Sequence, residues 1–366
     1  MRPLCVLLSR RCATLCVPLR QKCVPLCIPL RQKCAPLCVP PEAEMHPLCV
    51  PLSRKCAPYA SPWHKNASPR INSSTLRKRR ISDMIRILTD TASDFDLEEA
   101  AELGVTMLPM EITIGDESFR DRYDLTPDRF YEMLIESSDL PHTSQINSYA
   151  FEQEYIKIQA AGDSAIVILM SSKLSGTYQN AVIAAKEYEN IRVVDSETGS
   201  VGEQLLVRYA LMLRDKGREI DDIVHRLEVR KKQIRVLALL DTLEYVKKGG
   251  RLGTAAAAFG TLLSIKPVLT VENGKIKILG KARGSRNGNN FLNKEIMETG
   301  IEYRLPVAAA YSGLDRTKLD HYIEDSRSIW EGVIGEIPVS QLGSTIGTHA
   351  GPGTIVVAYF MRRAKA

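Results

Sequence analysis

The chain has 366 residues, with 49 Lys and Arg against 43 Asp and Glu, and all nine cysteines lie within the first 56 positions. The basic excess lies at the same end: residues 1–83 hold 15 Lys and Arg and 3 Asp and Glu, whereas residues 84–366 hold 34 and 40. The net charge therefore gives no indication that the folded part binds nucleic acid. No run of 18 uncharged apolar residues follows Met84, so we predict a cytoplasmic protein without integral membrane association.

Residues 1–83 form a leader built on an 11-residue repeat, as in "CVPLRQKCVPL" and "CIPLRQKCAPL". Its alternating six- and three-residue gaps between cysteines, without a histidine pattern, do not favour a zinc or disulfide framework. Frequent prolines argue against the amphipathic helix of a transit peptide, and arginines interrupt any secretory apolar run. We expect the leader to be a translated upstream repeat, with Met84 as the true start. The alternative is a disordered Pro-rich tail.

From Met84 onward, short apolar runs alternate with amphipathic segments. Apolar runs such as "AIVILM" lack a period of two, which indicates strands covered on both faces of a parallel sheet. Strands are predicted at 84–90, 105–115, 164–172, 191–196, 234–242, 305–313, 335–341 and 354–360, with a hairpin at 266–283. Helices are predicted at 91–104, 125–137, 148–161, 176–188, 200–216, 219–232, 243–249, 288–299 and 315–331.

This alternation predicts an α/β fold of two domains. We place a doubly wound, mostly parallel sheet in residues 84–234 and a second α/β domain with a mixed sheet in residues 235–366.

The stretch "SSKLSGTYQNA" follows the predicted strand 164–172 and opens a helix. Its small residues Ser175, Gly176 and Thr177 place backbone donors and hydroxyls at a helix N-terminus, where doubly wound sheets bind anionic ligands. The alternative is that Ser175 or Thr177 only caps the helix. The same two alternatives hold for the loop "HTSQINS", with Thr143 and Ser144. Asp90, at the end of the first strand, is better explained as a cap of the following turn.

Near the end of the chain, "GSTIGTHAGPG" sets His349 among glycines and a proline. Such a composition predicts a turn or a surface of close approach, because glycine and proline both disfavour regular structure. In "KKGGRLG", Arg251 lies between glycines and could clamp a carboxylate or phosphate, although it could also be a solvated surface arginine. Lys266, before Pro267, is either inward-facing or solvated.

Signatures of other chemistries are missing from the sequence. The six histidines are scattered, so no metal site is predicted, and neither a G-x-x-x-x-G-K-[ST] loop nor a G-x-S-x-G elbow occurs. We therefore predict no cofactor. The hydroxyl-rich and glycine-rich loops indicate a site that holds an anion.

In chain order, "ILTDTASDF", "TSQ", "SSKLSGTYQNA", "VVDSETGSVG", "LEYVKKGGRLG", "LLSIKPVLTVENGKI" and "THAGPG" resemble the DegV family of bacterial fatty-acid-binding proteins. The resemblance runs from Met84 to about Phe360, and it implies a start near Met84. It also implies two α/β domains with one long-chain fatty acid buried between them. The family usually carries a proline after "TSQ", where this chain has Ile146.

The resemblance further implies a non-enzymatic, substrate-presenting subunit. A partner fatty acid kinase would phosphorylate the bound carboxylate with ATP, and the acyl phosphate would feed phospholipid synthesis. By that resemblance, Thr143, Ser144 and Ser175 would hold the carboxylate. Arg251 and His349 would lie near the head group and the surface that faces the kinase. The alternative is an enzyme of small-ketone or phosphotransfer chemistry that uses His349.

Overall fold

The structure is a computed structural model that describes residues 84–137, 139–252, 265–333 and 335–362, and two short strands near the start of the chain. Contacts divide the chain into Met1–Asn72 and Ser73–Ala366. In the first unit, Pro18–Leu19 (β1) pairs antiparallel with Lys22–Cys23 (β2). The predictions made for the leader, namely an early start or a disordered tail, otherwise lie outside the described residues.

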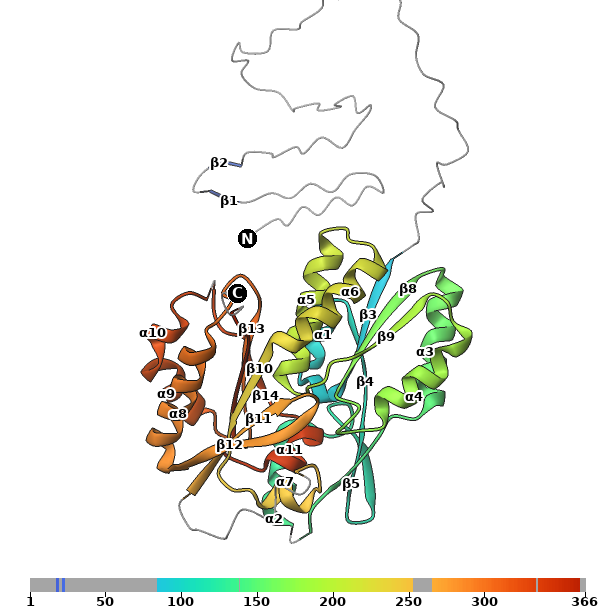
Figure 1. The fold of residues 1–366 in the computed structure, drawn as a ribbon. Coiled ribbons are helices and arrows are strands. Elements are labelled where there is room, and N and C mark those ends of the chain that lie inside the picture. The colour runs from blue at the N-terminus through green and yellow to red at the C-terminus, as the bar shows by residue number, and fades with distance from the viewer. Residues whose placement is uncertain are drawn as a thin grey trace, which may run out of the picture. The chain divides into compact units, whose positions relative to one another are not determined.

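A four-stranded parallel sheet, in the order β4-β3-β8-β9, organises the first part of the second unit (Figure 1). Its strands are β3 (Ile85–Asp90), β4 (Val105–Leu108), β8 (Ser164–Leu169) and β9 (Ile191–Asp195). Ile166 and Ile168 of β8 pack into one core cluster, whereas Val167 and Leu169 pack into another. Both faces of β8 are therefore covered, which confirms the prediction drawn from its continuous apolar run.

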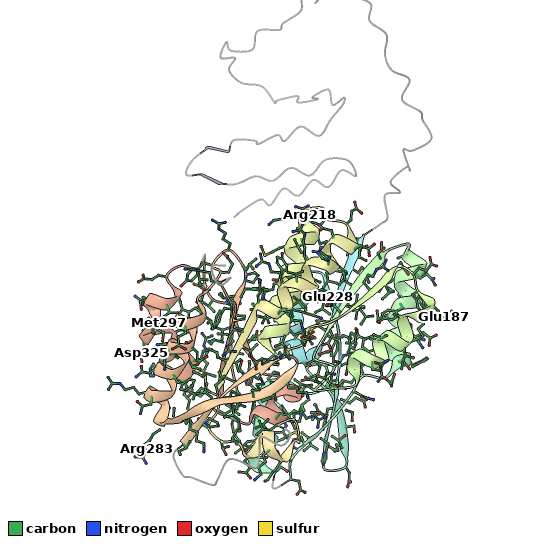
Figure 2. The ribbon with its side chains drawn as sticks, in the orientation of Figure 1. Glu187, Arg218, Glu228, Arg283, Met297 and Asp325 are labelled. Atoms are coloured by element: carbon green, nitrogen blue, oxygen red, sulfur yellow. The ribbon has the colours of Figure 1, made fainter. Side chains whose placement is uncertain are left out.

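Helices cover the two faces of this sheet. Those of this region are α1 (Leu97–Glu102), α2 (Pro127–Glu136), α3 (Ser148–Ala161), α4 (Thr177–Ala184), α5 (Val201–Asp215) and α6 (Ile220–Arg230), with the 3-10 turns Thr91–Ser93 (η1), Ala185–Glu187 (η2) and Lys231–Gln233 (η3). Helices α3 and α4 supply apolar side chains to one core cluster, and α5 and α6 to the other. Charged side chains such as Arg218 and Glu228 lie at the surface (Figure 2). The predicted helix 148–161 coincides with α3.

A small antiparallel sheet, which the sequence did not reveal, projects beside the parallel one. It has the order β6-β5-β7, formed by β5 (Glu111–Ile114), β6 (Glu117–Arg120) and β7 (His142–Ser144). The prediction of one strand over 105–115 is wrong, because the ladder breaks at Pro109, which has no N–H to donate. The segment containing Thr143 and Ser144, predicted as a loop, is an edge strand.

The last part of the chain forms a six-stranded mixed sheet in the order β12-β11-β10-β15-β13-β14. Its strands are β10 (Ile234–Leu239), β11 (Ile265–Glu272), β12 (Lys275–Arg283), β13 (Val307–Tyr311), β14 (Val339–Gln341) and β15 (Ile355–Phe360). Only β13 and β14 pair in parallel among these described strands. The predicted hairpin is confirmed: Asn273 and Gly274 both have positive φ, 51° and 77°, as a type I′ turn requires.

Helix α5 packs against both sheets, so the hydrophobic core continues from one to the other. The domain boundary near residue 234 stays a prediction. The remaining helices are α7 (Glu244–Lys248), α8 (Gly284–Thr299), α9 (Thr317–Asp325), α10 (Arg327–Trp330) and α11 (Ser344–Ala350). The predicted continuous helix 315–331 is wrong, since Ser326 separates α9 from α10. None of the helices in the described ranges could cross a membrane on grounds of length and apolarity.

Candidate functional site

A cavity of about 450 Å³ lies between the six-stranded sheet and the loops that follow β8 and β9. The loop after β8 supplies Met170 and Leu174, and the loop after β9 supplies Ser200. Open α/β sheets bind ligands outside the carboxyl ends of their strands, which is where these loops lie. The cavity is therefore in the place that the "SSKLSGTYQNA" stretch indicated.

Most of the cavity wall is apolar. The aliphatic and thioether side chains that line it come from several elements: Met110, Met170, Leu174, Val236, Ala238, Leu240, Val246, Leu269, Val271, Ile276, Leu342, Ile346, Ala350 and Val356. Four threonines also line it, and the hydroxyls of three of them already donate elsewhere: Thr270 to Val236 O at 2.7 Å, Thr345 to Asp121 at 2.6 Å and Thr354 to Ala350 O at 3.0 Å. The wall thus suits a hydrocarbon chain.

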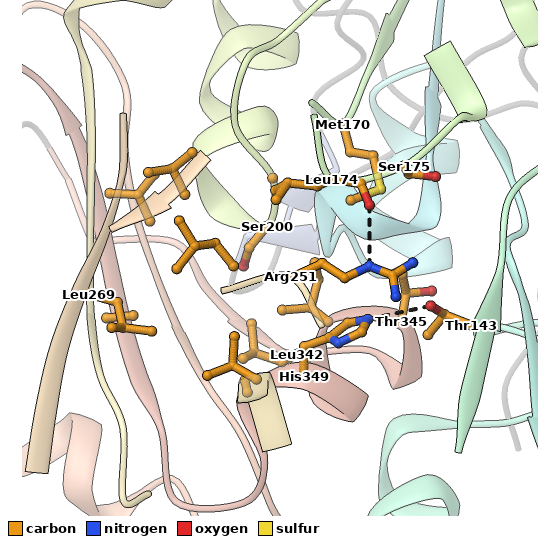
Figure 3. A pocket seen from close by; sticks show the side chains of 18 of the residues that line it. Thr143, Met170, Leu174, Ser175, Ser200, Arg251, Leu269, Leu342, Thr345 and His349 are labelled. Carbon is orange, nitrogen blue, oxygen red and sulfur yellow. Dashed lines mark hydrogen bonds between the residues drawn. The ribbon is translucent and has the colours of Figure 1, made fainter. Parts of the chain in front are cut away.

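Polar groups gather at one end of the cavity. Figure 3 shows Thr143, Arg251 and His349 on one side and Leu269 on the other. The predicted site residues that line the cavity are Thr143, Ser144, Ser175, Gly176, Arg251 and His349. The cavity is therefore amphipathic along its length, with a hydrogen-bonding end and an apolar remainder.

Thr177, the seventh predicted residue, does not line the cavity but supports a residue that does. It is fully buried, and its hydroxyl lies 2.9 Å from that of Ser175. The same Thr177 oxygen accepts the backbone N–H of Ile146 at 3.2 Å. A proline at position 146 would have no N–H to donate. The departure from the usual "TSQ-Pro" pattern thus coincides with a hydrogen bond between two of the polar loops.

His349 is the most buried titratable group at the polar end. Its Nε2 lies 3.4 Å from Thr143 Oγ1, and its Nδ1 has no hydrogen-bond partner among the described residues. Burial, helped by the positive charge of Arg251, lowers the pKa of His349 to about 4. The imidazole is therefore neutral near pH 7, with one nitrogen able to donate and the other able to accept.

Arg251 provides the positive charge beside this imidazole. Its Nη1 donates to Gly249 O at 2.8 Å, and its Nε donates to Leu174 O at 3.4 Å (Figure 3). A guanidinium has five N–H donors, so these two backbone contacts fix the side chain and leave donors for an anion. Whether Arg251 clamps an anion stays a prediction.

The glycines around the site permit close approaches. A Cβ on Gly249 would lie 2.1 Å from His349 Nδ1, and one on Gly176 would lie 1.8 Å from Gln145 Oε1. A Cβ on Gly347 would lie 2.6 Å from Tyr131 Oη. Side chains at these positions would displace the imidazole, a cavity-lining amide or the helix that carries His349. The prediction of a close-approach surface in "GSTIGTHAGPG" is confirmed at Gly347.

The expectation that the composition of "GSTIGTHAGPG" disfavours regular structure is wrong, because Ser344–Ala350 is helix α11. Asp121, fully buried after β6, stabilises its first turn by accepting four hydrogen bonds. These come from the N–H and hydroxyl of Ser344, at 3.0 and 2.6 Å, and from those of Thr345, at 3.3 and 2.6 Å. A carboxylate at a helix N-terminus satisfies its free N–H groups, which offsets the cost of the glycines.

Asp90 and Lys266, the other two residues singled out in the sequence, lie outside the cavity wall. Asp90 accepts the N–H of Ala92 at 2.9 Å and that of Met170 at 3.1 Å, which confirms its role as a cap. Burial raises the pKa of Asp90 to about 7. Lys266 pairs with Asp241. Among the described residues, no group of three or more His, Cys, Asp or Glu side chains could hold a metal ion.

An α/β fold with an amphipathic cavity at the carboxyl ends of its parallel strands is the arrangement of a small-molecule-binding protein. Residues 84–362 match the family described as "Uncharacterised protein, DegV family", and the chain belongs to that family. It is 31% identical over 274 residues to the DegV domain-containing protein TTE1491 of Caldanaerobacter subterraneus subsp. tengcongensis, covering 74% of this chain and 96% of that protein.

Solved structures of the same family share the fold. A DegV family protein from Thermus thermophilus, described by its fatty acid binding, aligns with a TM-score of 0.70 at 31% identity, over 76% of this chain and 100% of the other. DegV from Bacillus subtilis, described as a fatty acid binding protein, aligns with a TM-score of 0.67 at 28% identity, over 77% and 100%. The two-domain α/β fold class predicted from the sequence is thereby confirmed.

Proposed function

We propose that this protein binds one long-chain fatty acid, with the carboxylate at the polar end of the cavity and the acyl chain along its apolar wall. The observation that carries the proposal is the division of one 450 Å³ cavity into a hydrogen-bonding end and an aliphatic remainder. The solved relatives described as fatty acid binding support it. A small polar substrate, as in the alternative enzyme, would leave most of this wall without contacts.

The acyl chain supplies most of the binding free energy. Burial of a methylene is worth about 0.8 kcal/mol, so the methylenes of a C16 acid together offer roughly 10 kcal/mol. The cost of ordering the chain reduces that sum. Thr270, Thr345 and Thr354 add little polarity to the wall, because their hydroxyl protons are already donated to backbone or carboxylate oxygens.

The head group requires donors, since an unpaired carboxylate is costly to bury. The hydroxyls of Thr143, Ser144 and Ser175 and the neutral imidazole of His349 can each donate, and Arg251 contributes a positive charge. We assign the carboxylate to the hydroxyls of Thr143 and Ser175. Arg251, which is exposed, and His349 would adjoin the partner that approaches the head group.

We further propose that the protein presents this carboxylate to a cytoplasmic fatty acid kinase. The carboxylate oxygen would attack the γ-phosphorus of ATP, and the bond from that phosphorus to ADP would break, giving an acyl phosphate and ADP. The chain itself would supply no nucleotide site, since no phosphate-binding loop signature occurs in its sequence. The product would serve phospholipid synthesis.

The binding step is tested by native mass spectrometry of the full chain purified without detergent, followed by solvent extraction of its ligand. We expect one equivalent of a long-chain fatty acid. A protein that stays empty when palmitate or oleate is supplied would overturn the proposal and favour the small-ketone alternative.

The presentation step is tested by mixing the loaded chain with a purified fatty acid kinase and ATP, and trapping acyl phosphate with hydroxylamine. Hydroxamate should form only when both proteins are present. Hydroxamate formed by this chain alone would contradict a non-enzymatic role.

A further inference from the structure

A second cavity, of about 640 Å³, lies on the opposite face of the six-stranded sheet, against helices α8 and α9. Figure 1 shows these helices together on one side of the sheet. Leu239 and Ile355 form its floor, whereas the neighbouring residues Ala238 and Val356 line the first cavity. Because side chains alternate across a strand, β10 and β15 separate the two cavities.

The lining of the second cavity is ionic and amide-rich. Lys266, Arg286 and Lys318 supply positive charge there, His321 adds a titratable imidazole, and Asp241 and Asp325 supply negative charge. The cations exceed the carboxylates, although residues 84–366 as a whole carry 34 Lys and Arg against 40 Asp and Glu. A locally positive cavity in this otherwise acidic part of the chain favours an anionic ligand.

Two of the cations are positioned by one carboxylate. Asp241 accepts hydrogen bonds from Lys266 through Oδ1 and from Lys318 through Oδ2, the latter at 2.7 Å. Burial alone would raise the pKa of Asp241, but these two ammonium groups lower it, so the carboxylate is ionised. Each ammonium has three N–H donors and donates one to Asp241, which leaves the others for a ligand.

The backbone beside Asp241 is shaped for this pair of lysines. Gly353, in the loop that follows His349, also lines the second cavity. A Cβ at Gly353 would lie 2.5 Å from Asp241 Oδ2 and 2.7 Å from Lys318 Nζ, so any side chain would disturb the ion pairs. Its φ of +77° also favours glycine.

The remaining donors of this cavity differ in whether they already form hydrogen bonds within the protein. Arg286, on α8, makes no hydrogen bond or ion pair with any residue that the structure describes. On the other side, Asn293 and Ser326 bond to each other at 2.9 Å. Asn289 and Asn290 add amides along the same wall.

We propose that this second cavity binds a small phosphate monoester that also carries hydroxyl groups. The ammonium groups of Lys266 and Lys318 and the guanidinium of Arg286 would contact the phosphate, because a dianion with three terminal oxygens accepts from several donors at once. The asparagine amides suit the hydroxyls. The volume exceeds what inorganic phosphate needs and falls within the range of sites for small organic ligands.

The test is isothermal titration calorimetry of the full chain with ribose 5-phosphate, ribose and inorganic phosphate. We expect ribose 5-phosphate to bind, ribose not to bind, and phosphate to bind more weakly than the ester. Arg286→Gln and Lys318→Met should each weaken binding of ribose 5-phosphate by at least roughly tenfold. Lys294→Gln is the matched control, since Lys294 is an exposed α8 residue near Glu298 and outside the cavity.

Absence of binding at about 10 mM ribose 5-phosphate would overturn the proposal, as would equal binding by the wild type and both cavity variants. A glutamate-rich peptide that binds through Arg286 and Lys318 when ribose 5-phosphate does not would also overturn it, in favour of an acidic protein partner. Extraction of fatty acid from the same samples reports on the first cavity separately. Failure of one proposal is thus distinguishable from failure of the other.

Discussion

Val236, Ala238 and Leu240 lie on one face of β10 and the residues after it, and they line the first cavity, called here the aliphatic cavity. Leu239 and Asp241 lie on the other face and border the second cavity, called here the ionic cavity. The two faces differ in how their polar groups are used. Toward the aliphatic cavity, threonine hydroxyls are already engaged by protein oxygens. Toward the ionic cavity, the lysines share one carboxylate and keep donors free. The comparison teaches that the engagement of hydrogen-bonding groups, together with residue type, sets the character of a cavity.

The sharpest way to break this comparison is to fill one cavity only. In Ala238→Trp the new indole would occupy space needed by the acyl chain, so we expect the variant to purify without fatty acid, a loss of affinity of more than about 100-fold. Native mass spectrometry measures the occupancy. The matched control is Ser285→Trp, placed in the ionic cavity, which should keep one equivalent of acid. Loss of acid from both variants would contradict the separation of the two faces.

Helix α11 belongs to the aliphatic face, and Asp121 stabilises it. Asp121→Ala removes the acceptor of four hydrogen bonds in a buried setting, so the free energy of unfolding should fall by about 3 kcal/mol. Urea denaturation measures the change. Asp124→Ala in the same loop is the control, because Asp124 is exposed and pairs with the exposed Arg120. Its effect should be within about 0.5 kcal/mol. Equal losses would exclude a special role for Asp121.

A smaller effect is expected from the hydroxyl at the polar end. Ser175→Ala should weaken fatty acid binding about tenfold, the worth of a hydrogen bond to a charged group. Displacement of a fluorescent fatty acid measures the affinity, with Ser172→Ala in the same loop as a control outside the cavity wall.

Arg251→Ala should reduce fatty acid binding less than it reduces phosphorylation of the bound carboxylate. Full occupancy in Ser175→Ala, together with loss of acid from Arg251→Ala, would reverse the two roles.

The smallest effect concerns the titration of His349. Its pKa in the empty protein should be about 4, below the ordinary 6.5, and should rise when a carboxylate is bound beside it. Between about pH 4 and pH 6.5, residue 349 binds more protons in the unfolded chain than in the folded chain. The stability contributed by His349 therefore decreases as the pH falls from about 6.5 to 4. Imidazole NMR shifts measure the pKa, with His349→Gln assigning the resonance. A pKa unchanged by palmitate would place the head group elsewhere.

Much of the fold was predictable because its signals are local. The apolar run through β8 and the Asn273–Gly274 turn each depend on a few consecutive residues. Helix α11 was not predictable in this way. Its stability depends on Asp121, which lies 223 positions from Ser344 in the sequence, so no local pattern could identify the pair.

The candidate site follows the same rule. Thr143, Ser175, Arg251 and His349 stand in stretches of unusual composition and were therefore noticed, whereas Met110 and Ser200 were not singled out and join the wall only through the fold. Thr177 was predicted as a site residue because it lies in the stretch that borders the cavity. Its hydroxyl, however, faces Ser175 and the Ile146 N–H rather than the cavity. Composition thus identified the polar end. The aliphatic wall required the packing of two sheets.

The alternation along β10 bears on how the two cavities can diverge over evolutionary time. A substitution at Ala238 alters one cavity and a substitution at Asp241 alters the other, so point changes can tune acyl length and anion choice independently. An insertion of one residue before β10 would instead exchange the two faces. Asp241 would then point toward the hydrocarbon and Leu240 toward the lysines. Insertions and deletions in this strand should therefore be removed by selection, whereas substitutions should be tolerated.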